Sequence, residues 1–412
     1  MRPTRRPLAV VLTIAAIGLA SCSSDGSDSA RTPRGPTASS TAASAAVSTT
    51  TTKPDPCAVT PIAVTGPAGQ SVFVDDADFV TSLAWAPDGR MFFAERGGAI
   101  KVARDGKVTT FATVPTVTTE RGGGYSERGL LGLALSPTFV TDHFVYAFYS
   151  RNDYSTQVVV RFTDCAGAAS EPTTLISLPA GSGCCHKGGR LAFGPDGKLF
   201  VTLGDELATT AESVSSETSV PQDPSDVRGK ILRYDADGSI PADNPFGASS
   251  AAWATGLRNL YGLAFDPGGN LFADPNGPTG DIGTPAHGYD LALMVERGGR
   301  YQWPACYGYS HLVPGATSCL GRPDPQWSSE SDTLVPTGAT WVDAAGPAPY
   351  AGHFVFCNAF AGMRVFVPGA PHASVLAGPD ECRFDVKQGP DHALYFSDQS
   401  AIYRLGADPT HS

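Results

Sequence analysis

One pattern recurs along most of the chain and limits the folds that the chain can adopt. A short apolar run, a turn with proline, and a second apolar run follow one another. The clear copies are LAWAPDGRMFFAE from 83, LALSPTFVTDHFVYAFY from 133, LAFGPDGKLFVTLGD from 191, LAFDPGGNLFADPNG from 263 and VKQGPDHALYFSD from 386. A weaker copy, TGATWVDAAGPAPYAGHFVFC, starts at 337. Because Asp-Gly after proline favours a tight hairpin and helical spacing is scarce, we predict an all-β fold made of hairpins.

The spacing of these hairpins indicates a repeat architecture. The turn prolines lie at 87, 137, 195, 267, about 347 and 390. Intervals of roughly 40 to 80 residues fit four-stranded blades with loop insertions, so we predict a six-bladed β-propeller. A β-sandwich is the alternative, but it needs fewer similar hairpins. In a propeller, ligands usually bind on loops at the mouth of the central channel.

The N-terminus has the features of an export signal. A basic start is followed by the apolar run Leu8–Ala20, which is short for a membrane span, and then by Ser21 and Cys22. The ending Leu-Ala-Ser-Cys resembles a bacterial lipobox, so we predict a lipoprotein signal peptide at 1–21 and lipidation of Cys22. A plain signal peptide is the alternative. The protein would then be anchored by lipid to the cell membrane and face the extracytoplasmic side.

The residues after the signal divide into a tether and a folded part. Residues 22–56 are rich in Ser, Thr, Ala and Pro and lack aromatic side chains, so we predict a disordered linker. Residues 57–408 would form the propeller. The formal charge of −11 argues against nucleic-acid binding, which needs a basic face. We expect contact with the membrane only through the lipid anchor.

Eight cysteines follow Cys22, and an even number in an exported domain suggests four disulfides. The pairs that we expect are Cys306–Cys319 across a short loop, Cys357–Cys382 on neighbouring strands, Cys57–Cys165, and the remaining adjacent Cys184–Cys185. The sequence leaves other interpretations of the adjacent pair open. Each cysteine could pair elsewhere, the two could form a labile redox pair, or they could bind copper or zinc with His186.

Several ordered motifs resemble one known family. They are ERGLLGLALSP from 127, HKGGRLAFGPDGKLFVTLGD from 186, GKILRYDADGSIPADNPF from 229, GLRNLYGLAFDP from 256 and GGRYQWPACYG from 298. These stretches resemble the glucose/sorbosone dehydrogenase family, from about residue 75 to 406. Its members are soluble quinoprotein aldose dehydrogenases, six-bladed propellers that use pyrroloquinoline quinone (PQQ) and calcium. The fold also occurs in non-enzymatic relatives.

The resemblance implies roles for individual residues. His186 would be the general base that removes a sugar hydroxyl proton, and Arg258 would face the reactive ring of the cofactor. Asn259 and Glu127 would contact the cofactor or the substrate. The structural alternatives are a turn histidine beside a disulfide, an Arg-Asn pair that ties a loop, and a surface salt bridge from Glu127 to Arg128 or Arg258. Asp205-Glu206 would orient a basic group at the same mouth, or would simply be solvated.

The adjacent cysteines and the calcium loop complete the predicted site. A ring formed by Cys184 and Cys185 would offer a flat platform for a planar ring or a sugar, and Lys187 is a nearby cation. For calcium, the resemblance implies backbone carbonyls of Gly277 and Pro278, the acidic side chain of Asp290, and the carbonyl of Tyr301. The alternative is a metal-free loop closed by Trp303-Pro304, because an acidic ligand and an asparagine of the family pattern are missing here.

Three positions depart from the family's cofactor pocket. PQQ is a tricarboxylate and needs cationic partners. Alignment places Phe360, or a small residue beside it, where the family has a lysine, and Cys382 and Phe384 where it has two arginines. Arg383 is one residue off, which on a strand would point it to the other face. We therefore weigh two functions: a sugar dehydrogenase with His186 as the base, and a non-catalytic propeller that binds a glycan, a small molecule or a protein. A redox protein that uses Cys184-Cys185 is a third hypothesis.

Overall fold

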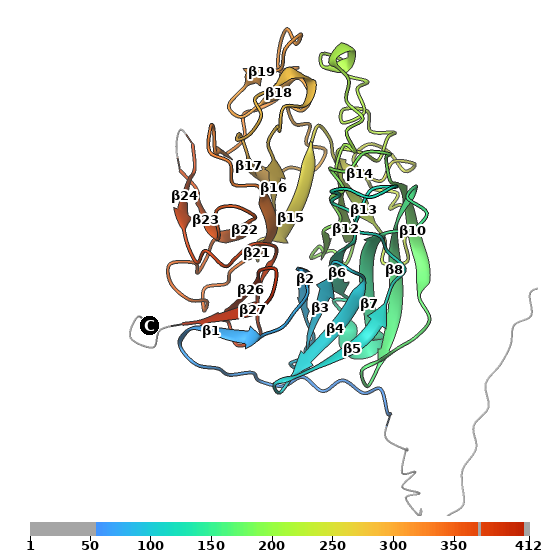
Figure 1. Ribbon diagram of the computed structural model, residues 1–412, viewed down its shortest axis with the longest axis vertical. Helices are drawn as coiled ribbons and strands as arrows, with labels where there is room; N and C mark the ends of the chain where they lie inside the picture. The colour runs from blue at the N-terminus through green and yellow to red at the C-terminus, as the bar shows by residue number, and fades with distance from the viewer. Residues whose placement is uncertain (1–54, 370–371, 408–412) are drawn as a thin grey trace, which may run out of the picture. The chain divides into compact units, whose positions relative to one another are not determined.

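The computed structural model describes residues 55–369 and 372–407, which form a six-bladed β-propeller (Figure 1). Each blade is an antiparallel sheet whose main path has four strands. The predicted signal peptide, the lipidation site Cys22 and nearly all of the predicted linker lie outside the described residues. Among the described residues, no helix has the length and apolar character needed to cross a bilayer.

The first three blades follow the order of the chain. Blade 1 contains β2 (Val80–Trp85), β3 (Met91–Glu95), β4 (Ala99–Arg104) and β5 (Lys107–Thr113). Blade 2 contains β6 (Leu130–Leu135), β7 (Phe144–Ser150), β8 (Thr156–Cys165) and β10 (Thr173–Pro179), with α1 (Phe139–Asp142) after β6 and the short β9 (Ala168–Ala169) beside β8. Blade 3 contains β11 (Leu191–Phe193), β12 (Leu199–Leu203), β13 (Lys230–Tyr234) and β14 (Ala252–Ala254), with the 3₁₀ turn η1 (Ala211–Ser213) between β12 and β13.

The last three blades continue the ring. Blade 4 contains β15 (Asn259–Phe265), β16 (Leu271–Asn276), β17 (Leu291–Val295) and β20 (Trp327–Ser328), with η2 (Asp281–Gly283) and the hairpin of β18 (Cys306–Tyr307) and β19 (His311–Leu312) in its loops. Blade 5 contains β21 (Pro336–Trp341), β22 (Phe354–Asn358), β23 (Arg364–Val367) and β24 (Ser374–Ala377). Blade 6 contains β25 (Val386–Gln388), β26 (Leu394–Ser397), β27 (Ile402–Gly406) and β1 (Gly69–Val74).

Each of the six repeated sequence patterns forms a hairpin in one blade, as predicted, and the structure shows that these are the inner two strands. In blade 3, for example, Leu191 pairs with Val201 and Phe193 with Leu199 across the Pro-Asp-Gly turn. The weaker copy from 337 also forms such a hairpin, between β21 and β22. The apolar side chains of these hairpins pack between neighbouring blades, as where Phe272 of blade 4 stacks on Phe354 of blade 5 with ring centroids 5.5 Å apart. Burying such a phenylalanine contributes about 1.5–3 kcal/mol.

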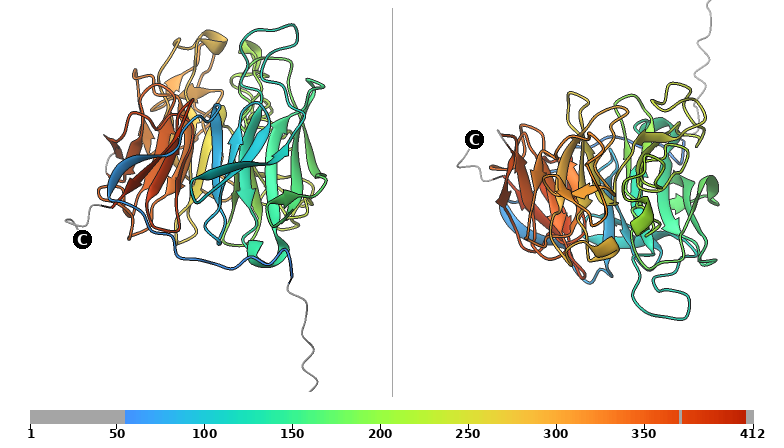
Figure 2. Two further views of the ribbon diagram at one scale, coloured as in Figure 1. Left: turned by 60° about the horizontal axis from the view of Figure 1, so that its bottom comes forward. Right: turned by 90° about the horizontal axis from the view of Figure 1, so that it is seen from above.

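The two ends of the folded chain close the ring. β1 is the outer strand of blade 6 and pairs antiparallel with β27, from Gly69 opposite Gly406 to Val74 opposite Ile402. Figures 1 and 2 show this first strand beside the last strands of the chain. Backbone hydrogen bonds thereby join segments that are far apart in sequence, and they cover the edge that β27 would otherwise expose.

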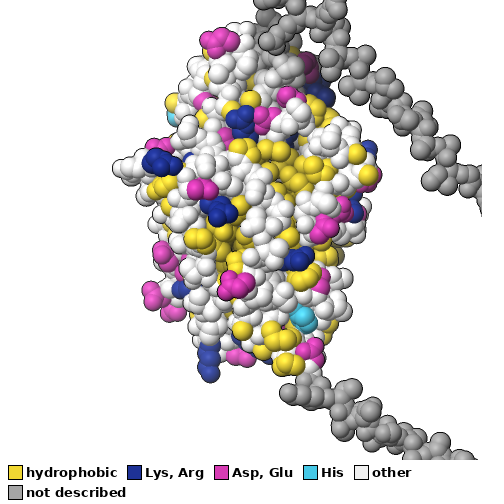
Figure 3. All heavy atoms as spheres, turned by 90° about the vertical axis from the view of Figure 1, so that its right-hand side faces the viewer, with side chains coloured by type: hydrophobic (Ala, Val, Ile, Leu, Met, Phe, Trp, Pro, Cys, Tyr) yellow, Lys and Arg dark blue, Asp and Glu magenta, His cyan; other side chains and the backbone are white. Residues whose placement is uncertain are grey.

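The structure contains the four disulfides that we expected: Cys57–Cys165, Cys184–Cys185, Cys306–Cys319 and Cys357–Cys382. One detail of the expectation was wrong, because Cys382 lies in a turn before β25 and not on a strand. On the face seen in Figure 3, acidic and basic side chains are interspersed with hydrophobic and uncharged ones.

Candidate active site

Residues that precede the inner strands meet at one end of the central channel. Glu127 lies just before β6, His186 before β11, and Asn259 begins β15. The backbone N–H of His186 donates to Glu127 Oε2 at 2.6 Å, and Asn259 Nδ2 donates to the same oxygen at 3.2 Å. The fold therefore brings these predicted residues from blades 2, 3 and 4 together.

His186 is held by Asp205, which follows β12 of the same blade. The His186 ring is 2% exposed, and its Nδ1 lies 2.5 Å from Asp205 Oδ1. The second carboxylate oxygen, Oδ2, accepts from Trp303 Nε1 at 2.8 Å. Burial alone would raise the pKa of Asp205, but His186, Arg258 and Trp303 together hold that pKa below its ordinary value. Asp205 is therefore an ionised partner that fixes the imidazole.

The other ring nitrogen of His186 is available to a ligand. Among the described residues, none forms a hydrogen bond with His186 Nε2. Because an ionised carboxylate only accepts, Nδ1 carries the proton toward Asp205 and Nε2 keeps its lone pair. This is the tautomer that a general base needs.

Glu127 does not form the ion pair with Arg128 or Arg258 that the sequence suggested. Its Oε2 instead accepts from Tyr261 Oη at 2.6 Å, in addition to the two donors from His186 and Asn259. Burial and the nearby carboxylate raise the pKa of Tyr261 well above its ordinary value, so the phenol remains a donor. Glu127 therefore ties the turn at His186 to blade 4.

Arg258 lies at the same mouth in a network of fixed acceptors. Its Nε and Nη2 form a two-pronged contact with Asp281, at 2.9 and 3.0 Å. Nη1 donates to the carbonyl of Gly277 at 2.5 Å, and Nη2 also donates to Thr279 at 2.8 Å. These contacts use four of the five guanidinium N–H groups, which leaves one on Nη1.

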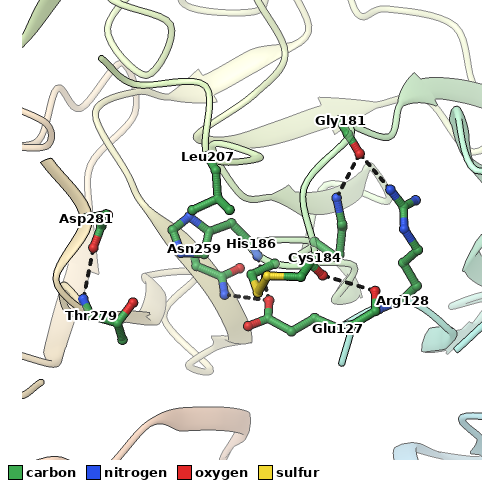
Figure 4. Close-up of a disulfide and its surroundings, with 12 residues drawn as sticks. Glu127, Arg128, Gly181, Cys184, His186, Leu207, Asn259, Thr279 and Asp281 are labelled. Carbon is green, nitrogen blue, oxygen red and sulfur yellow. Dashed lines mark hydrogen bonds between the residues drawn. A yellow bond between two sulfur atoms is a disulfide. The ribbon is translucent and has the colours of Figure 1, made fainter. Parts of the chain in front are cut away.

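The Cys184–Cys185 ring lies in a loop that blade 2 holds at two points (Figure 4). The carbonyl of Cys184 accepts from Glu127 N at 2.9 Å and from Ser126 Oγ at 3.1 Å. The carbonyl of Gly181 accepts from Arg128 Nη2 at 2.6 Å. The interpretations in which each cysteine pairs elsewhere or both bind metal were therefore wrong, since the two sulfurs are bonded to each other.

Lys187 points away from the mouth. Its Nζ pairs with Glu206, and both side chains are fully buried. Gln157 Nε2 donates to the other carboxylate oxygen of Glu206 at 2.5 Å. Burial raises the pKa of Glu206 to about 7, and burial also lowers the pKa of Lys187. Lys187 is therefore engaged in a buried pair and does not face a cofactor.

Three of the predicted calcium ligands, Gly277, Pro278 and Tyr301, line one cavity, but the Gly277, Tyr301 and Asp290 oxygens are engaged by protein donors. Both oxygens of Asp290 accept backbone N–H groups, from Gly277 at 2.9 Å and from residues 334 and 335 at 2.9 and 3.0 Å. The Gly277 carbonyl accepts from Arg258, and the Tyr301 carbonyl accepts from Gln222 at 2.7 Å. Within the described residues, no group of three or more His, Cys, Asp and Glu side chains is placed to hold a metal.

The cations near the mouth are also engaged. Arg96 donates to three backbone carbonyls, and Arg190 forms an ion pair with Asp385 at 3.0 Å. Arg383 precedes β25, so our argument from strand alternation was wrong, and it donates to a backbone carbonyl at 3.2 Å. The residues present therefore do not fit the three carboxylates of PQQ.

Aromatic rings occupy the side of the mouth where the family pattern has cations. Phe384 stacks on Phe79 with centroids 4.3 Å apart, and the Arg96 guanidinium lies 5.1 Å from the Phe79 centroid. Phe360 is 70% exposed and therefore does not fill a pocket. This side offers flat apolar surface in place of charge.

Sequence reasoning missed several members of the site. Asp281 accepts from Arg258, Trp303 donates to Asp205, and Tyr261 donates to Glu127. One signal was present in the sequence. His186-Lys187 and Asp205-Glu206 are both adjacent pairs, and each partner lies 19 residues from the other. A histidine followed by a lysine, with two acidic residues at the same spacing after the next two strands, indicates two parallel contacts.

Comparison with known proteins gives a consistent result. The model of the family described as Glucose / Sorbosone dehydrogenase matches residues 78–403. Quinoprotein glucose dehydrogenase B of Acinetobacter calcoaceticus is 32% identical over 254 residues, which is 55% of this chain and 50% of that protein, so this chain matches about half of that relative's length. An aldose sugar dehydrogenase of Escherichia coli is 30% identical over 365 residues, 82% of this chain and 92% of that protein.

Solved structures agree with this result. The PQQ-bound aldose sugar dehydrogenase of Streptomyces coelicolor is 26% identical, with a TM-score of 0.62, and the match covers 82% of this chain and 99% of that one. The family model covers most of the propeller, from β2 to β27. The chain therefore belongs to the glucose/sorbosone dehydrogenase family.

Proposed function

We propose that this protein is a lipid-anchored, extracytoplasmic sugar dehydrogenase in which His186 is the general base. The observation that carries the proposal is the buried His186–Asp205 contact of 2.5 Å with Nε2 left open. A site that only binds sugars does not need a histidine held by an ionised, buried aspartate. The relatives named as glucose and aldose sugar dehydrogenases support a sugar as the substrate.

The proton of the sugar hydroxyl goes to His186 Nε2. Asp205 fixes the ring and stabilises the imidazolium that forms, while Trp303 keeps the carboxylate in place. The remaining N–H of Arg258 supplies a donor for the oxygen that gains charge, and Asp281 prevents the guanidinium from rotating. The hydride that leaves the carbon would pass to an external two-electron acceptor of the ortho-quinone class, which becomes the hydroquinone as the sugar hydroxyl is oxidised.

A second function has its own support. Lys187, Arg190 and Arg383 each donate to protein acceptors, and Arg258 keeps one N–H, which favours a propeller that binds a sugar without oxidising it. On this hypothesis His186 Nε2 would accept a hydrogen bond from a sugar hydroxyl and no turnover would follow.

One set of measurements separates these functions. Purified protein is supplied with an aldose panel, a reducible dye, and either PQQ with calcium or an uncharged ortho-quinone. Dye reduction that needs His186 and is lost in His186→Asn supports the dehydrogenase. Aldose binding by calorimetry without dye reduction supports the binding function. If no aldose binds and no dye is reduced, both proposals fail.

The anchor is tested separately from the site. Export with the lipobox-like ending predicts a diacylglycerol thioether on Cys22. Mass spectrometry of the N-terminal peptide should show this modification, and Cys22→Ala should release the protein from the membrane fraction. A wild-type peptide that starts elsewhere and carries no lipid would refute the anchor.

A further inference from the structure

The central channel has a second cavity at the end opposite His186. The cavity measures about 380 Å³ and is lined by residues of all six inner strands. His186 and Glu127 precede the first residues of their inner strands, whereas the cavity contacts the last residues, such as Phe193 of β11 and Leu135 of β6. Because the inner strand of every blade runs in the same direction, the cavity and the His186 mouth lie at opposite ends of the channel.

A layer of charged side chains closes the channel between these two ends. Arg190 reaches across the axis from blade 3, where its Nη1 lies 3.0 Å from both Ser82 Oγ of blade 1 and Asp385 Oδ2 of blade 6. Gly262 and Gly338 make room for this layer, since a Cβ at either position would overlap a carboxylate of the layer. The cavity therefore ends blindly at these ion pairs.

The walls of the cavity combine aromatic rings with small residues. Trp85, Phe193, Phe265 and Trp341 are the last residues of four inner strands and line its rim. The residues just before them are alanine in blades 1, 3 and 4 and threonine in blade 5. Blade 6 has Lys387 at this position, next to the last residue of β25. Among the described residues that line the cavity, Lys387 carries the only charge.

Lys387 connects the cavity to the charged layer. Its Nζ donates to the carbonyl of Ala339 at 2.5 Å and lies 3.3 Å from Asp385 Oδ1. Two of its three N–H groups are thus engaged, and one remains. Asp385 also pairs with Arg190, so two cations share one carboxylate.

A second carboxyl group does not balance this charge. Asp274 is fully buried, and within the described part of the chain neither of its oxygens has a hydrogen-bond partner. Burial raises its pKa well above the ordinary value, which favours the uncharged acid. Burial lowers the pKa of Lys387, although the charge of Asp385 acts to raise it. A bound anion would also favour the charged ammonium.

We propose that this distal cavity binds a small aromatic carboxylate, with its ring among the rim aromatics and its carboxylate on Lys387. A volume of about 380 Å³ lies near the lower end of the range of small-molecule sites, roughly 300–1,000 Å³. The apolar rim favours a planar apolar body, and the single cation at the closed end favours one negative charge. The site is separate from the sugar site and does not depend on the proposed dehydrogenase activity.

The test uses a matched pair of probes, indole-3-acetate and indole-3-acetamide, measured by calorimetry on the purified chain. The acid should bind about ten-fold more tightly than the amide, because only the acid forms a charge-assisted contact with Lys387. In Lys387→Met the two affinities should become equal. Arg190 remains as the partner of Asp385 in this variant, so the charged layer is retained.

Two further variants locate the bound acid. Thr340→Phe fills the cavity from blade 5 without removing an ion pair and should abolish binding of both probes. His186→Asn should leave the affinity for the acid unchanged, because the channel is closed between the two sites. Equal affinities in the wild type, an acid preference that survives in Lys387→Met, or loss of acid binding in His186→Asn would each overturn the proposal, as would no binding at millimolar acid.

Discussion

Replacing Asp205 with asparagine should remove the base function of His186. Asp205 is surrounded by donors only: His186 Nδ1 at 2.5 Å and Leu207 N at 3.1 Å on Oδ1, and Trp303 Nε1 at 2.8 Å and Thr209 Oγ1 at 3.3 Å on Oδ2. An asparagine amide must turn its NH₂ toward one of these pairs. Each pair contains one group that only donates, Leu207 N at 3.1 Å or Trp303 Nε1 at 2.8 Å, and the longer contact with Leu207 is the weaker one to lose; on that side His186 can accept by moving its proton to Nε2. We therefore expect the NH₂ to face His186.

The size of the effect follows from the tautomer. With the proton on Nε2, the lone pair that should accept the sugar proton is lost. The same exchange in a Ser-His-Asp triad lowers kcat about 10⁴-fold, which corresponds to about 5.5 kcal/mol of activation free energy. Losing charge-assisted hydrogen bonds at a buried carboxylate should also lower the free energy of unfolding by about 1.5–3 kcal/mol.

Two assays test this reasoning, and one does not depend on turnover. Long-range ¹H–¹⁵N correlation spectra report directly which nitrogen of His186 carries the proton. The wild type should show protonated Nδ1, and Asp205→Asn should show protonated Nε2. As a control, Thr209→Val removes only the 3.3 Å contact and should keep the wild-type tautomer. If the tautomer is the same in the wild type and Asp205→Asn, Asp205 does not set it and the argument is refuted.

Three further predictions concern the surroundings of the base. Lys187→Met should lower the free energy of unfolding by about 3–5 kcal/mol in urea titrations, because it leaves Glu206 buried without its cation. Adding Glu206→Leu should restore much of this loss. Equal stability of the single and double variants would contradict this prediction. Replacing both Cys184 and Cys185 with serine should weaken aldose binding in calorimetry and leave the melting temperature nearly unchanged, since the ring lies beside His186 and away from the blade cores. Unchanged aldose affinity would argue against a platform. Arg258 lowers the pKa of Asp281, so the stability that this pair contributes is complete above about pH 4 and is lost as the pH falls further. Asp281→Asn should therefore show a smaller drop in melting temperature between pH 5 and pH 3 than the wild type. Equal drops would refute the assignment.

The sequence predicted the blades because their inner hairpins repeat one local pattern. Apolar strands around Pro-Asp-Gly turns depend mainly on nearby residues, so all of these hairpins were recognised. The closure of the ring depends on a distant partner instead. β1 has mostly exposed or half-buried side chains and pairs with Ile402–Gly406, and its own sequence carries no hydrophobic pattern that would indicate this pairing.

The candidate site was predicted in part for the same reason. His186, Arg258 and Asn259 belong to contiguous motifs, and so do Asp205, Trp303 and Tyr261, but the contacts between these motifs are set by the tertiary fold, and Asp281 lies in a loop outside them. The loop that carries Asp281 includes Ile282 at a φ of 50°, a conformation that sequence does not indicate for isoleucine. Arg383 was placed on the wrong face because we assumed a strand where the chain still turns before β25.

The His186–Asp205 contact can persist without cations at the positions of Phe360 and Phe384, because the two sets of residues belong to different blades. His186 and Asp205 come from blade 3, and Arg258 comes from blade 4, whereas Phe384 and Phe360 come from the segments around blades 5 and 6. Each blade brings its own entry loop to the mouth, so substitutions on one side can remove charge without disturbing hydrogen bonds on the other. Removing an arginine from such a mouth also removes the cost of keeping a buried cation without its anion. On the proposed function, such a site would take a proton from a hydroxyl group and would favour uncharged or stacked ligands over a multiply charged cofactor.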